Sequence, residues 1–477
     1  MVYELLNYAI DLALRKGASY AEARFHEIRS DVILTKEETV MGVGGEVSRG
    51  IAIRLLVDGI ISFASTATIT REGVEQAIDK AVSRARALAE KGLNKGLPRE
   101  LSPARLGRAR YSVIVAKPYD SRPLDDKIKY LTGIAKAVRE RLREAKLASL
   151  TMEYHEILEH KIIVTSDGGY VESEIPRILV GYNLVLAHPQ KGTIQRFSFL
   201  GASAGLEALD EWNLVESLPS EASSLERVLV QGVEPPKGRM PVVLGSEVVG
   251  LIVHESCGHP MEADRVWGRE AAQAGESFVK ERKIGDVIGN ELATVIDDPT
   301  IPKSFGFYLY DDECVAARPR YLYYRGTINE MLHNRWSAAI YGVESNGAAR
   351  ANDFLSEPIP RMSNTYLEPG DYSFEELIED INFGLYIKNY MEWNIDDYRW
   401  GQRYIGLEAY IIRNGELAEP VRNPVLEFTT EKFYRSLEAK GKELRFYAAF
   451  CGKGEPMQAI PVWMGGPDVR LKDLVVR

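Results

Sequence analysis

The chain contains 477 residues, of which 45% are hydrophobic and 27% are charged, and its formal net charge is −10 at pH 7. This composition is typical of a globular protein, and the length favours two domains, because single cores rarely grow beyond about 250–300 residues. No apolar run approaches the roughly 20 residues that span a bilayer, and the first residues lack the features of a signal peptide. We therefore expect a cytoplasmic protein without membrane association, and the negative charge disfavours nucleic acid as its main partner.

Hydrophobic periodicity predicts that the first half of the chain mixes helices and strands. Apolar residues at helical spacing predict helices over residues 3–15, 74–91 and 125–146. Alternating patterns predict strands over residues 21–34, 51–63, 151–165, 178–188 and 193–200, with a turn at Asp58-Gly59. The Gly-, Pro- and Arg-rich segment 91–110 is typical of a connection or an exposed loop.

The second half of the chain is predicted to be rich in strands. Gly and Pro residues cluster at 232–238, which indicates a boundary, and a short strand over 240–244 follows. Most of the remaining sequence contains short strands separated by turns such as Asn414-Gly415. We predict an α+β fold with an N-terminal mixed α/β domain over residues 1–232, which a break near 91–123 would divide into two subdomains. A β-rich catalytic domain over residues 233–477 would carry the helix that begins near residue 246.

The pattern His-Glu-x-x-x-His occurs twice, over residues 254–259 and over residues 155–160. Two neutral imidazoles can supply half of a zinc shell, and an unligated carboxylate beside them can accept a proton. The pattern therefore indicates metal-dependent hydrolysis. The copy at 155–160 runs directly into the β-branched stretch 162–165, and positions five apart on a strand point to opposite faces. We expect that His155 and His160 do not share an ion.

The copy at 254–259 is predicted to lie on a helix that begins with Ser246 as its N-cap. On a regular helix, His259 would point about 140° away from His254. Gly258 tolerates unusual dihedral angles and Pro260 cannot donate a backbone hydrogen bond, so both favour a local π-like widening that makes positions five apart neighbours. The alternative is that both histidines are ordinary core or surface residues.

A third metal ligand is needed, because catalytic zinc usually has three protein ligands and one open position. The chain has only three cysteines, too few for a disulfide framework. Cys257 is close to His254 on a helix, and Cys451 lies in a glycine-rich loop, so either thiolate could serve. Cys314 is predicted to be a strand-end residue, and a buried hydrophobic role is the alternative for Cys257.

The residues from His254 to Asp264, His-Glu-Ser-Cys-Gly-His-Pro-Met-Glu-Ala-Asp, resemble the signature of the TldD/PmbA family of metallopeptidases, on the TldD side. The resemblance covers nearly the whole chain and is most specific in its C-terminal half. Further matching stretches lie far apart in the sequence, namely 42–50, 167–168, 345–347, 360–366, 368–371, 414–416 and 451–453.

This resemblance implies a zinc peptidase whose metal ligands are His254, His259 and Cys451, with Glu255 as general base on metal-activated water. It implies that unfolded or small peptides enter an enclosed cavity. It also implies a heterodimer with a TldE (PmbA)-type paralogue, a homodimer being the other arrangement. The family often has Gly-Gln soon after Cys-Gly-Lys, whereas residues 454–458 here are Gly-Glu-Pro-Met-Gln, so the substrate contacts of this loop are in question.

Other hypotheses concern substrate binding and alternative functions. A peptide would lie extended against a strand edge, which the sequence does not identify. Glu262 and Asp264 are predicted to be solvated acids at a helix end, the alternative being that they orient the imidazoles. A non-catalytic peptide-binding partner subunit is the main rival function. The basic stretch 80–146 could bind nucleic acid, but its interleaved acids favour a salt-bridged helix face.

Overall fold

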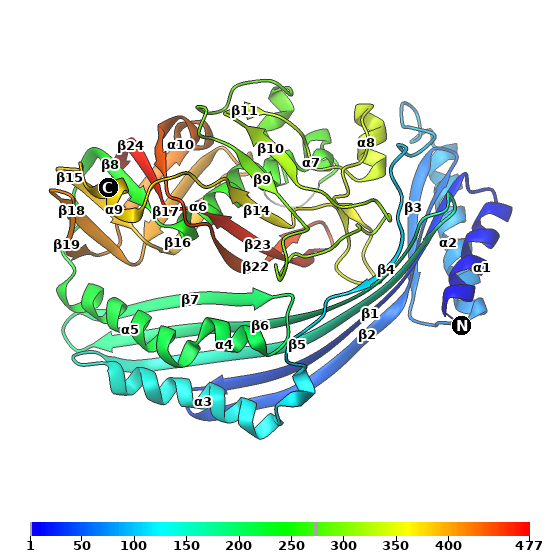
Figure 1. The fold of residues 1–477 in the computed structure, drawn as a ribbon. Helices are drawn as coiled ribbons and strands as arrows, with labels where there is room; N and C mark the ends of the chain where they lie inside the picture. Colours follow the sequence, from blue (N-terminus) through cyan, green and yellow to red (C-terminus); the bar gives the residue numbers. More distant parts are fainter. Residues whose placement is uncertain (1, 271–274) are drawn as a thin grey trace.

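The computed structural model describes residues 2–270 and 275–477. Within these residues the strands form three sheets, of seven, six and nine strands, and one two-stranded ribbon. Figure 1 shows the long strands of the first sheet, here called the curved sheet, running beneath the C-terminal half of the chain. Helices and strands thus segregate into an α+β fold, as the sequence predicts.

The curved sheet is built from long strands that pair mainly antiparallel. It contains β3 (Ile60–Thr66), β2 (Thr39–Val57), β1 (Tyr20–Lys36), β5 (Lys146–Thr165), β6 (Tyr170–His188) and β4 (Arg108–Ser112) in this order, with β7 (Gly192–Ala202) also on β6. All five strands predicted for this half are confirmed, including the turn at Asp58-Gly59. β2 is longer than predicted, because the glycine-rich stretch before residue 51 continues the ladder with β1.

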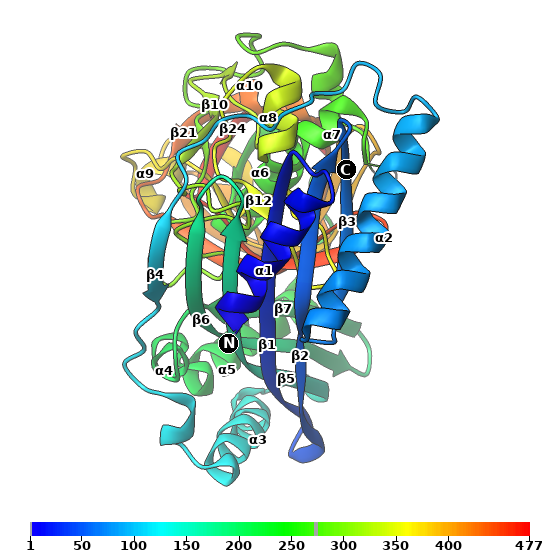
Figure 2. The same cartoon turned by 90° about the vertical axis from the view of Figure 1, so that its right-hand side faces the viewer.

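Two groups of helices cover this sheet, each above its own hydrophobic cluster. They are α1 (Val2–Arg15) and α2 (Arg71–Glu90) at one end, and α3 (Leu124–Arg141), α4 (Glu207–Trp212) and α5 (Leu214–Gln231) at the other. Figure 2 shows α1 and α2 lying against β1, β2 and β3. In the described part of the chain, no helix is both long enough and apolar enough to cross a membrane.

Two helix predictions in this half need correction. The helix predicted to continue to residue 146 ends at Arg141, because the carboxylate of Glu226 accepts hydrogen bonds from the backbone N–H groups of residues 143–145. These groups are therefore satisfied outside a helix, and β5 begins at once. Helix α5 is not predicted from the sequence, although its buried residues, such as Leu218 and Leu225, have helical spacing. Pro219 within the helix, and several serines, make this helical periodicity difficult to recognise in the sequence.

The C-terminal half contains the other two sheets and short connecting helices. The central sheet has the order β11 (Thr327–Ile328), β10 (Arg320–Tyr324), β9 (Val295–Asp297), β14 (Asn364–Leu367), β23 (Gln458–Gly466), β22 (Arg445–Lys453). The outer sheet has the order β16 (Tyr390–Ile395), β17 (Gly401–Gly406), β20 (Val425–Thr429), β24 (Val469–Val476), β8 (Gly238–Leu244), β15 (Phe383–Ile387), β18 (Ala409–Arg413), β19 (Glu416–Val421), with β21 (Leu437–Lys440) also on β24. The ribbon is β12 (Ala349–Arg350) with β13 (Ile359–Pro360), and the short helices are α7 (Ala263–Trp267), α8 (Arg335–Tyr341), α9 (Phe374–Ile378) and α10 (Thr430–Ser436).

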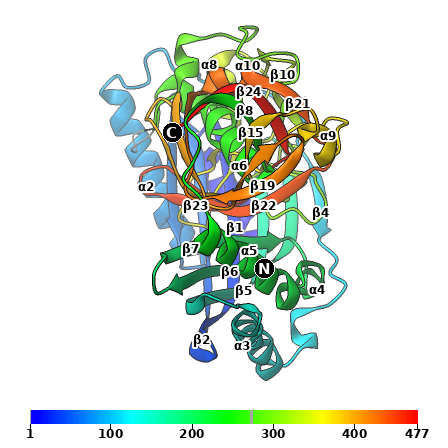
Figure 3. The same cartoon turned by 90° about the vertical axis from the view of Figure 1, so that its left-hand side faces the viewer.

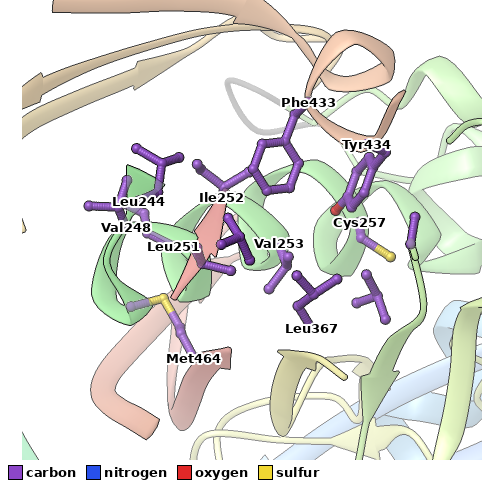
Figure 4. Packing of buried hydrophobic residues seen from close by; sticks show 14 of the residues in the cluster. Leu244, Val248, Leu251, Ile252, Val253, Cys257, Leu367, Phe433, Tyr434 and Met464 are labelled. Carbon is purple, nitrogen blue, oxygen red and sulfur yellow. The ribbon is translucent and has the colours of Figure 1, made fainter. Parts of the chain in front are cut away.

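Helix α6 (Ser246–Val253) lies at the centre of this half, and each of its residues is buried. In Figure 3 strands of the central and outer sheets surround it, and in Figure 4 its side chains pack against Leu367, Phe433 and Met464. Apart from Ser246 and Glu247 the helix is apolar, and such a helix is stable only in buried surroundings. The sheets therefore hold α6, and the residues that follow it, in a fixed position.

The helix begins one residue earlier than predicted, with Gly245 rather than Ser246 as its N-cap. A Cβ atom on Gly245 would lie 2.2 Å from the carbonyl oxygen of Lys388, so the close approach of these two backbones requires glycine. The backbone N–H of Ser246 donates instead to Asp468 Oδ1 at 2.7 Å. A distant side chain thus caps the helix.

Candidate metal centre

Residues His254–Gly258 form one turn of π-helix at the end of α6, as the sequence predicts. The N–H of His259 donates to the carbonyl oxygen of His254, a separation of five residues. The two imidazole ring centroids consequently lie 5.0 Å apart. The extra residue between the histidines is therefore accommodated by the wider turn, which brings both rings to one place.

Gly258 contributes to this turn differently from the prediction. Its φ of −53° and ψ of −63° are ordinary helical values, so unusual dihedral angles are not the reason for glycine here. A Cβ atom on Gly258 would lie 1.8 Å from Met362 Sδ. Any larger residue would therefore displace the Met362 side chain, which packs directly against the backbone of the turn.

We predict that Gly258→Ala lowers the free energy of unfolding by about 1–3 kcal/mol, because Met362 would have to move out of a well-packed site. Chemical denaturation of the metal-free protein measures this effect. Gly133→Ala is the control, since Gly133 lies within α3 and a methyl group added there would meet no neighbouring atom within 4 Å. We expect about 0.5–1 kcal/mol of added stability in this control. Equal stability of Gly258→Ala and wild type would contradict this explanation of the turn.

Cys451, on β22, completes a group with the two histidines. Its Sγ lies 3.4 Å from His259 Nε2, and the three potential ligand atoms lie within 4.8 Å of one another. Bonds of 2.0–2.3 Å place the ligand atoms of a tetrahedral zinc ion about 3.5 Å apart, so the group has nearly the required size. His254 Nδ1 is buried with no hydrogen-bond partner among the described residues. Two nitrogens and one sulfur suit a zinc ion.

The other two cysteines lie elsewhere. Cys257 is fully buried on the apolar side of the π turn, beside Tyr434 in the central core (Figure 4). Cys314 has a positive φ of 62° in a turn, and its thiol faces the carbonyl oxygen of Ile163. Burial raises the pKa of both thiols well above the usual value. Both cysteines are therefore packing residues in this structure.

The pKa shifts of His254, His259 and Cys451 favour the protonation states in which these side chains bind a metal ion. Burial lowers the pKa of His254, and it lowers that of His259 well below the usual value. Burial opposes ionisation of the Cys451 thiol, but His259 and Arg361 outweigh burial and lower its pKa to about 7. Neutral imidazoles and a readily formed thiolate are the metal-binding forms of these residues.

Glu262 is fully buried beside His259, which corrects the prediction of a solvated helix-end acid. Its Oε2 atom lies 3.0 Å from His259 Nδ1, so it holds the tautomer that leaves Nε2 directed toward Cys451. Arg265, Arg361 and Lys453 all lie within 4 Å of the same carboxylate and compensate its burial. Glu262 is therefore placed to orient one imidazole.

Asp264 is also buried, again unlike the predicted solvated acid. It accepts a hydrogen bond from Lys453 Nζ at 2.6 Å, and the same ammonium donates to the carbonyl oxygen of Pro360 at 2.9 Å. Arg361 donates to the carbonyl oxygen of Cys451 itself. Asp264 thus acts on Lys453 rather than on an imidazole, and these bonds fix the end of β22 to the residues that follow the π turn.

Glu255 lies in the π turn but outside the His–His–Cys group. Its carboxylate forms a buried ion pair with Arg399, which follows β16 and has a φ of 64°. The Arg399 carbonyl oxygen accepts a hydrogen bond from Thr430 Oγ1 at 2.8 Å, which holds this unusual backbone in place. A carboxylate fixed in this way lies beside the candidate ligands without joining them.

The second His-Glu-x-x-x-His pattern lies on β5, as predicted, and its histidines have separate partners. His155 contacts Glu153 and His160 contacts Glu172, each at 3.5 Å. Several basic residues of the 80–146 stretch are ion-paired on the surface, as the salt-bridged interpretation predicts; these pairs include Arg139–Glu38, Lys129–Asp126, Lys136–Glu140 and Arg110–Glu172.

The His–His–Cys group lines a cavity of about 620 Å³. Strands β7, β16 and β22 contribute to its wall, and each is an edge strand of its sheet. Aromatic side chains on these strands face the cavity, namely Phe197, Phe199, Tyr390, Trp393, Tyr447 and Phe450. The group is thus reachable through a space bounded by unpaired strand edges and apolar rings.

Models of the PmbA/TldA metallopeptidases match residues 21–89 as domain 1, residues 117–229 as the central domain and residues 237–477 as the C-terminal domain. The chain belongs to the PmbA/TldA metallopeptidase family. The family resemblance of the sequence is confirmed, and the chain is a metallopeptidase of this family.

Two relatives of this PmbA/TldA chain align with it over almost their full length. A metalloprotease of Methanothermobacter thermautotrophicus is 32% identical over 475 residues, covering 98% of this chain and 97% of the relative. A zinc metalloprotease TldD homolog of Saccharolobus solfataricus is 27% identical over 465 residues, covering 96% and 97%. The crystal structure of TldE from Thermococcus kodakarensis has the same fold, with a TM-score of 0.77, 18% identity and 99% of both chains covered.

Sequence reasoning assigned no role to four residues around this centre. Arg361, Met362 and Lys453 lie within stretches that carry the PmbA/TldA resemblance, so their positions were marked but not their contacts. Arg399 lies outside those stretches, and its pairing with Glu255 depends on a turn between two strands of the outer sheet. Only the fold reveals that contact.

Proposed function

We propose that the chain is a zinc-dependent metallopeptidase in which His254, His259 and Cys451 hold the ion and Glu255 is the general base. The observation that carries this proposal is the convergence of two imidazoles and one thiol within 4.8 Å at the wall of a large cavity, with Glu255 beside them but outside the group. Three protein ligands and an open side are typical of catalytic rather than structural zinc sites.

The donor set supports zinc as the metal. Imidazole and thiolate ligands favour zinc over magnesium or calcium, which prefer oxygen. The Saccharolobus relative, a zinc metalloprotease TldD homolog, agrees with this choice. A zinc ion bound here would supply Lewis acidity, polarising a water molecule and the scissile carbonyl group.

Glu255 performs the proton transfers in this proposal. Its carboxylate accepts a proton from the attacking water and donates it to the leaving amine, so that one residue acts first as base and then as acid. The ion pair with Arg399 keeps the carboxylate in a fixed orientation and opposes its movement into the ligand group. Glu262 keeps His259 in the tautomer that presents Nε2 to the centre.

The proposed substrates are unfolded or small peptides. Each of the edge strands β7, β16 and β22 offers unpaired backbone groups, and an extended peptide could pair with one of them irrespective of its sequence. The surrounding aromatic rings favour apolar side chains. Unfolded segments are favoured because all of their backbone groups are free, whereas a strand paired on both sides within a folded protein has none left for such pairing.

The proposed partner is a PmbA/TldE-type paralogue in a heterodimer, with a homodimer as the second arrangement. Family membership and the shared fold with TldE support a partner of this kind. Size-exclusion chromatography with light scattering, with and without the paralogue, distinguishes a mixed dimer from a homodimer.

Cleavage of an unfolded peptide library tests the proposed function. The purified chain is incubated with the library alone, with the paralogue, with a chelator, and with zinc restored after chelation. We expect cleavage that the chelator abolishes and zinc restores. A chain that holds no zinc and cleaves nothing in any mixture would instead be a non-catalytic peptide-binding subunit.

We predict that Glu262→Gln weakens zinc binding by about 10–100-fold, because an amide no longer holds His259 in the required tautomer. Competition with a chromogenic chelator measures the affinity. Glu281→Gln on the surface is the control and should bind zinc like the wild type. An unchanged zinc affinity of Glu262→Gln, with an intact fold, would show that Glu262 does not orient His259 for metal binding.

A further inference from the structure

We propose that Glu392 makes this metallopeptidase select peptides that carry a lysine or arginine side chain beside the cleaved bond. The proposal rests on the proposed function above and names the substrates that the same centre prefers. It follows from the charges and the aromatic rings that line the cavity of about 620 Å³ at the metal centre, hereafter the metal-centre cavity.

Glu392 lies on β16, at a place where this strand is irregular. The pairing of β16 with β17 shifts register between Tyr390 and Glu392, which leaves Met391 as an extra residue. Successive side chains of a regular strand point to opposite faces, but a bulge of this kind redirects the side chains next to it. All four residues from Tyr390 to Trp393 line the metal-centre cavity. The bulge thus explains how Glu392 and its neighbours on both sides reach one cavity.

Glu392 carries a charge that the described part of the chain does not compensate, unlike the other carboxylates of this cavity. Glu247 accepts two hydrogen bonds from Arg196, and Glu255 pairs with Arg399. Glu392 is exposed and forms no ion pair with any described residue. Its carboxylate therefore makes this wall of the cavity negative and leaves it open to a cation from outside the chain.

Uncompensated acids also line a neighbouring cavity of about 580 Å³, to which Trp393 contributes as well. Asp397 and Glu455 belong to that second cavity, and neither forms an ion pair with a described residue. All three of the described basic residues that line it pair with buried carboxylates. The surroundings of Glu392 thus favour positive groups over negative ones.

Aromatic rings in the metal-centre cavity add a second attraction for cations. Trp393, Phe197 and Phe450 line this cavity and are exposed. The face of an aromatic ring is negative and attracts an ammonium or guanidinium group within about 6 Å, while the apolar stem of such a side chain packs on the ring. An exposed carboxylate alone is ordinarily solvated. Together with these rings, Glu392 forms a site suited to a long cationic side chain.

A basic side chain fits this site better than a free amino terminus. The amine of a terminal residue lies about 2.5 Å from the carbonyl carbon to be cleaved, so an anion that binds it must lie beside the metal ligands. The carboxylates beside the ligands, Glu255 and Glu262, are already paired with arginines. A zinc ion bound through one thiolate would also leave a net positive charge there, which repels a terminal ammonium group. Lysine and arginine instead carry their charge several bonds away from the backbone.

Peptides that differ at one position test the proposal. One sequence without charged residues, acetylated and amidated at its ends, carries lysine, arginine, norleucine or glutamate at each position in turn. Binding to zinc-loaded Glu255→Gln gives Kd, and cleavage by wild type gives kcat/KM and the position of the cut bond. We expect lysine and arginine at one position beside that bond to improve both quantities by about five- to tenfold over norleucine. This advantage should shrink at about 1 M salt, because the Glu392 carboxylate is exposed.

Substitutions of Glu392 show whether this carboxylate causes the preference. Glu392→Gln removes the charge and keeps the shape, so lysine and norleucine peptides should differ by less than about twofold in Kd and kcat/KM. Glu392→Lys should reverse the preference and favour the glutamate peptide. Glu416→Gln is the control and should keep the wild-type ratio, since Glu416 is an exposed acid on β19, the edge strand at the other end of the outer sheet. For Kd, each substitution is combined with Glu255→Gln. The ratio isolates selectivity, because a general loss of activity affects both peptides equally.

Equal binding and cleavage of lysine and norleucine peptides by the unsubstituted cavity would overturn the proposal, as would a preference for lysine that survives Glu392→Gln. A preference that requires a free amino terminus and disappears in Glu392→Gln would overturn it too, because Glu392 would then bind a chain end. A Glu392-dependent preference in Kd without cleavage by wild type would instead contradict the proposed function and leave the role of Glu392 in place.

Discussion

Replacement of Cys451 by alanine is expected to abolish both zinc binding and peptide cleavage. In the proposed centre Cys451 supplies the only sulfur, on a strand 192 residues from His259 in sequence. Two imidazoles alone bind zinc far more weakly than three ligands, so zinc should fall from about one ion per chain to almost none. Metal analysis of the purified variant measures the zinc, and a fluorogenic unfolded peptide measures cleavage.

The other two cysteines provide matched controls for this variant. Cys257→Ala and Cys314→Ala remove a thiol from the core and from a turn, so both should retain zinc and cleavage, with some loss of stability. Full zinc occupancy in Cys451→Ala, or loss of zinc in Cys257→Ala with an intact fold, would show that the ligand group is misassigned.

Replacement of Glu255 by glutamine is expected to lower kcat by about 10²–10⁴-fold while zinc stays bound. The amide has nearly the same shape but cannot accept the proton of the attacking water. Because the change also leaves Arg399 without its ionic partner, thermal unfolding is compared in parallel. Steady-state cleavage and zinc content are measured on the same preparation.

The second copy of the pattern supplies the control for Glu255→Gln. Glu156→Gln makes the same chemical change beside two histidines, but on strand β5, where Lys127 pairs with the carboxylate. We expect cleavage to stay within about twofold of wild type, because this pair stabilises the curved sheet and Glu156 does not line the metal-centre cavity. Equal activity of Glu255→Gln and wild type would refute the general-base role.

Hydrophobic periodicity predicted many of the helices and strands, because their formation depends largely on the local pattern of apolar residues. The alternation along 21–34 and 151–165 predicted strands, and both segments are strands, although residues 20–27 and 162–165 are buried on both faces. The end of α3 could not be predicted in the same way, since it depends on the distant carboxylate of Glu226. Helix α5 was missed because Pro219 interrupts its pattern, although the surrounding contacts tolerate it.

Contacts between residues distant in sequence also limited the prediction of the candidate site. The spacing of His254 and His259, with Gly258 and Pro260, predicted the π turn, but it attributed the glycine to backbone freedom instead of the contact with Met362. Spacing could not choose between Cys257, in the π turn, and Cys451, because only the tertiary structure brings strand β22 beside that turn.

The remaining differences between the predicted and the observed site arise from buried contacts between distant segments. Glu262 was predicted to be solvated because acids at helix ends usually are, whereas three cations from separate segments compensate it here. Arg399 reaches Glu255 from the outer sheet, which no local pattern encodes. The residues that surround the centre therefore emerge only from tertiary structure.

Anomalous X-ray diffraction at the zinc absorption edge, on crystals of the zinc-loaded wild type, tests the central claim most directly. The account predicts one strong peak at about 2.0–2.3 Å from one nitrogen each of His254 and His259 and from Cys451 Sγ, with the Glu255 carboxylate outside bonding distance. A peak bound to Glu255 or Cys257, or no peak near these residues in crystals shown to contain zinc, would contradict it.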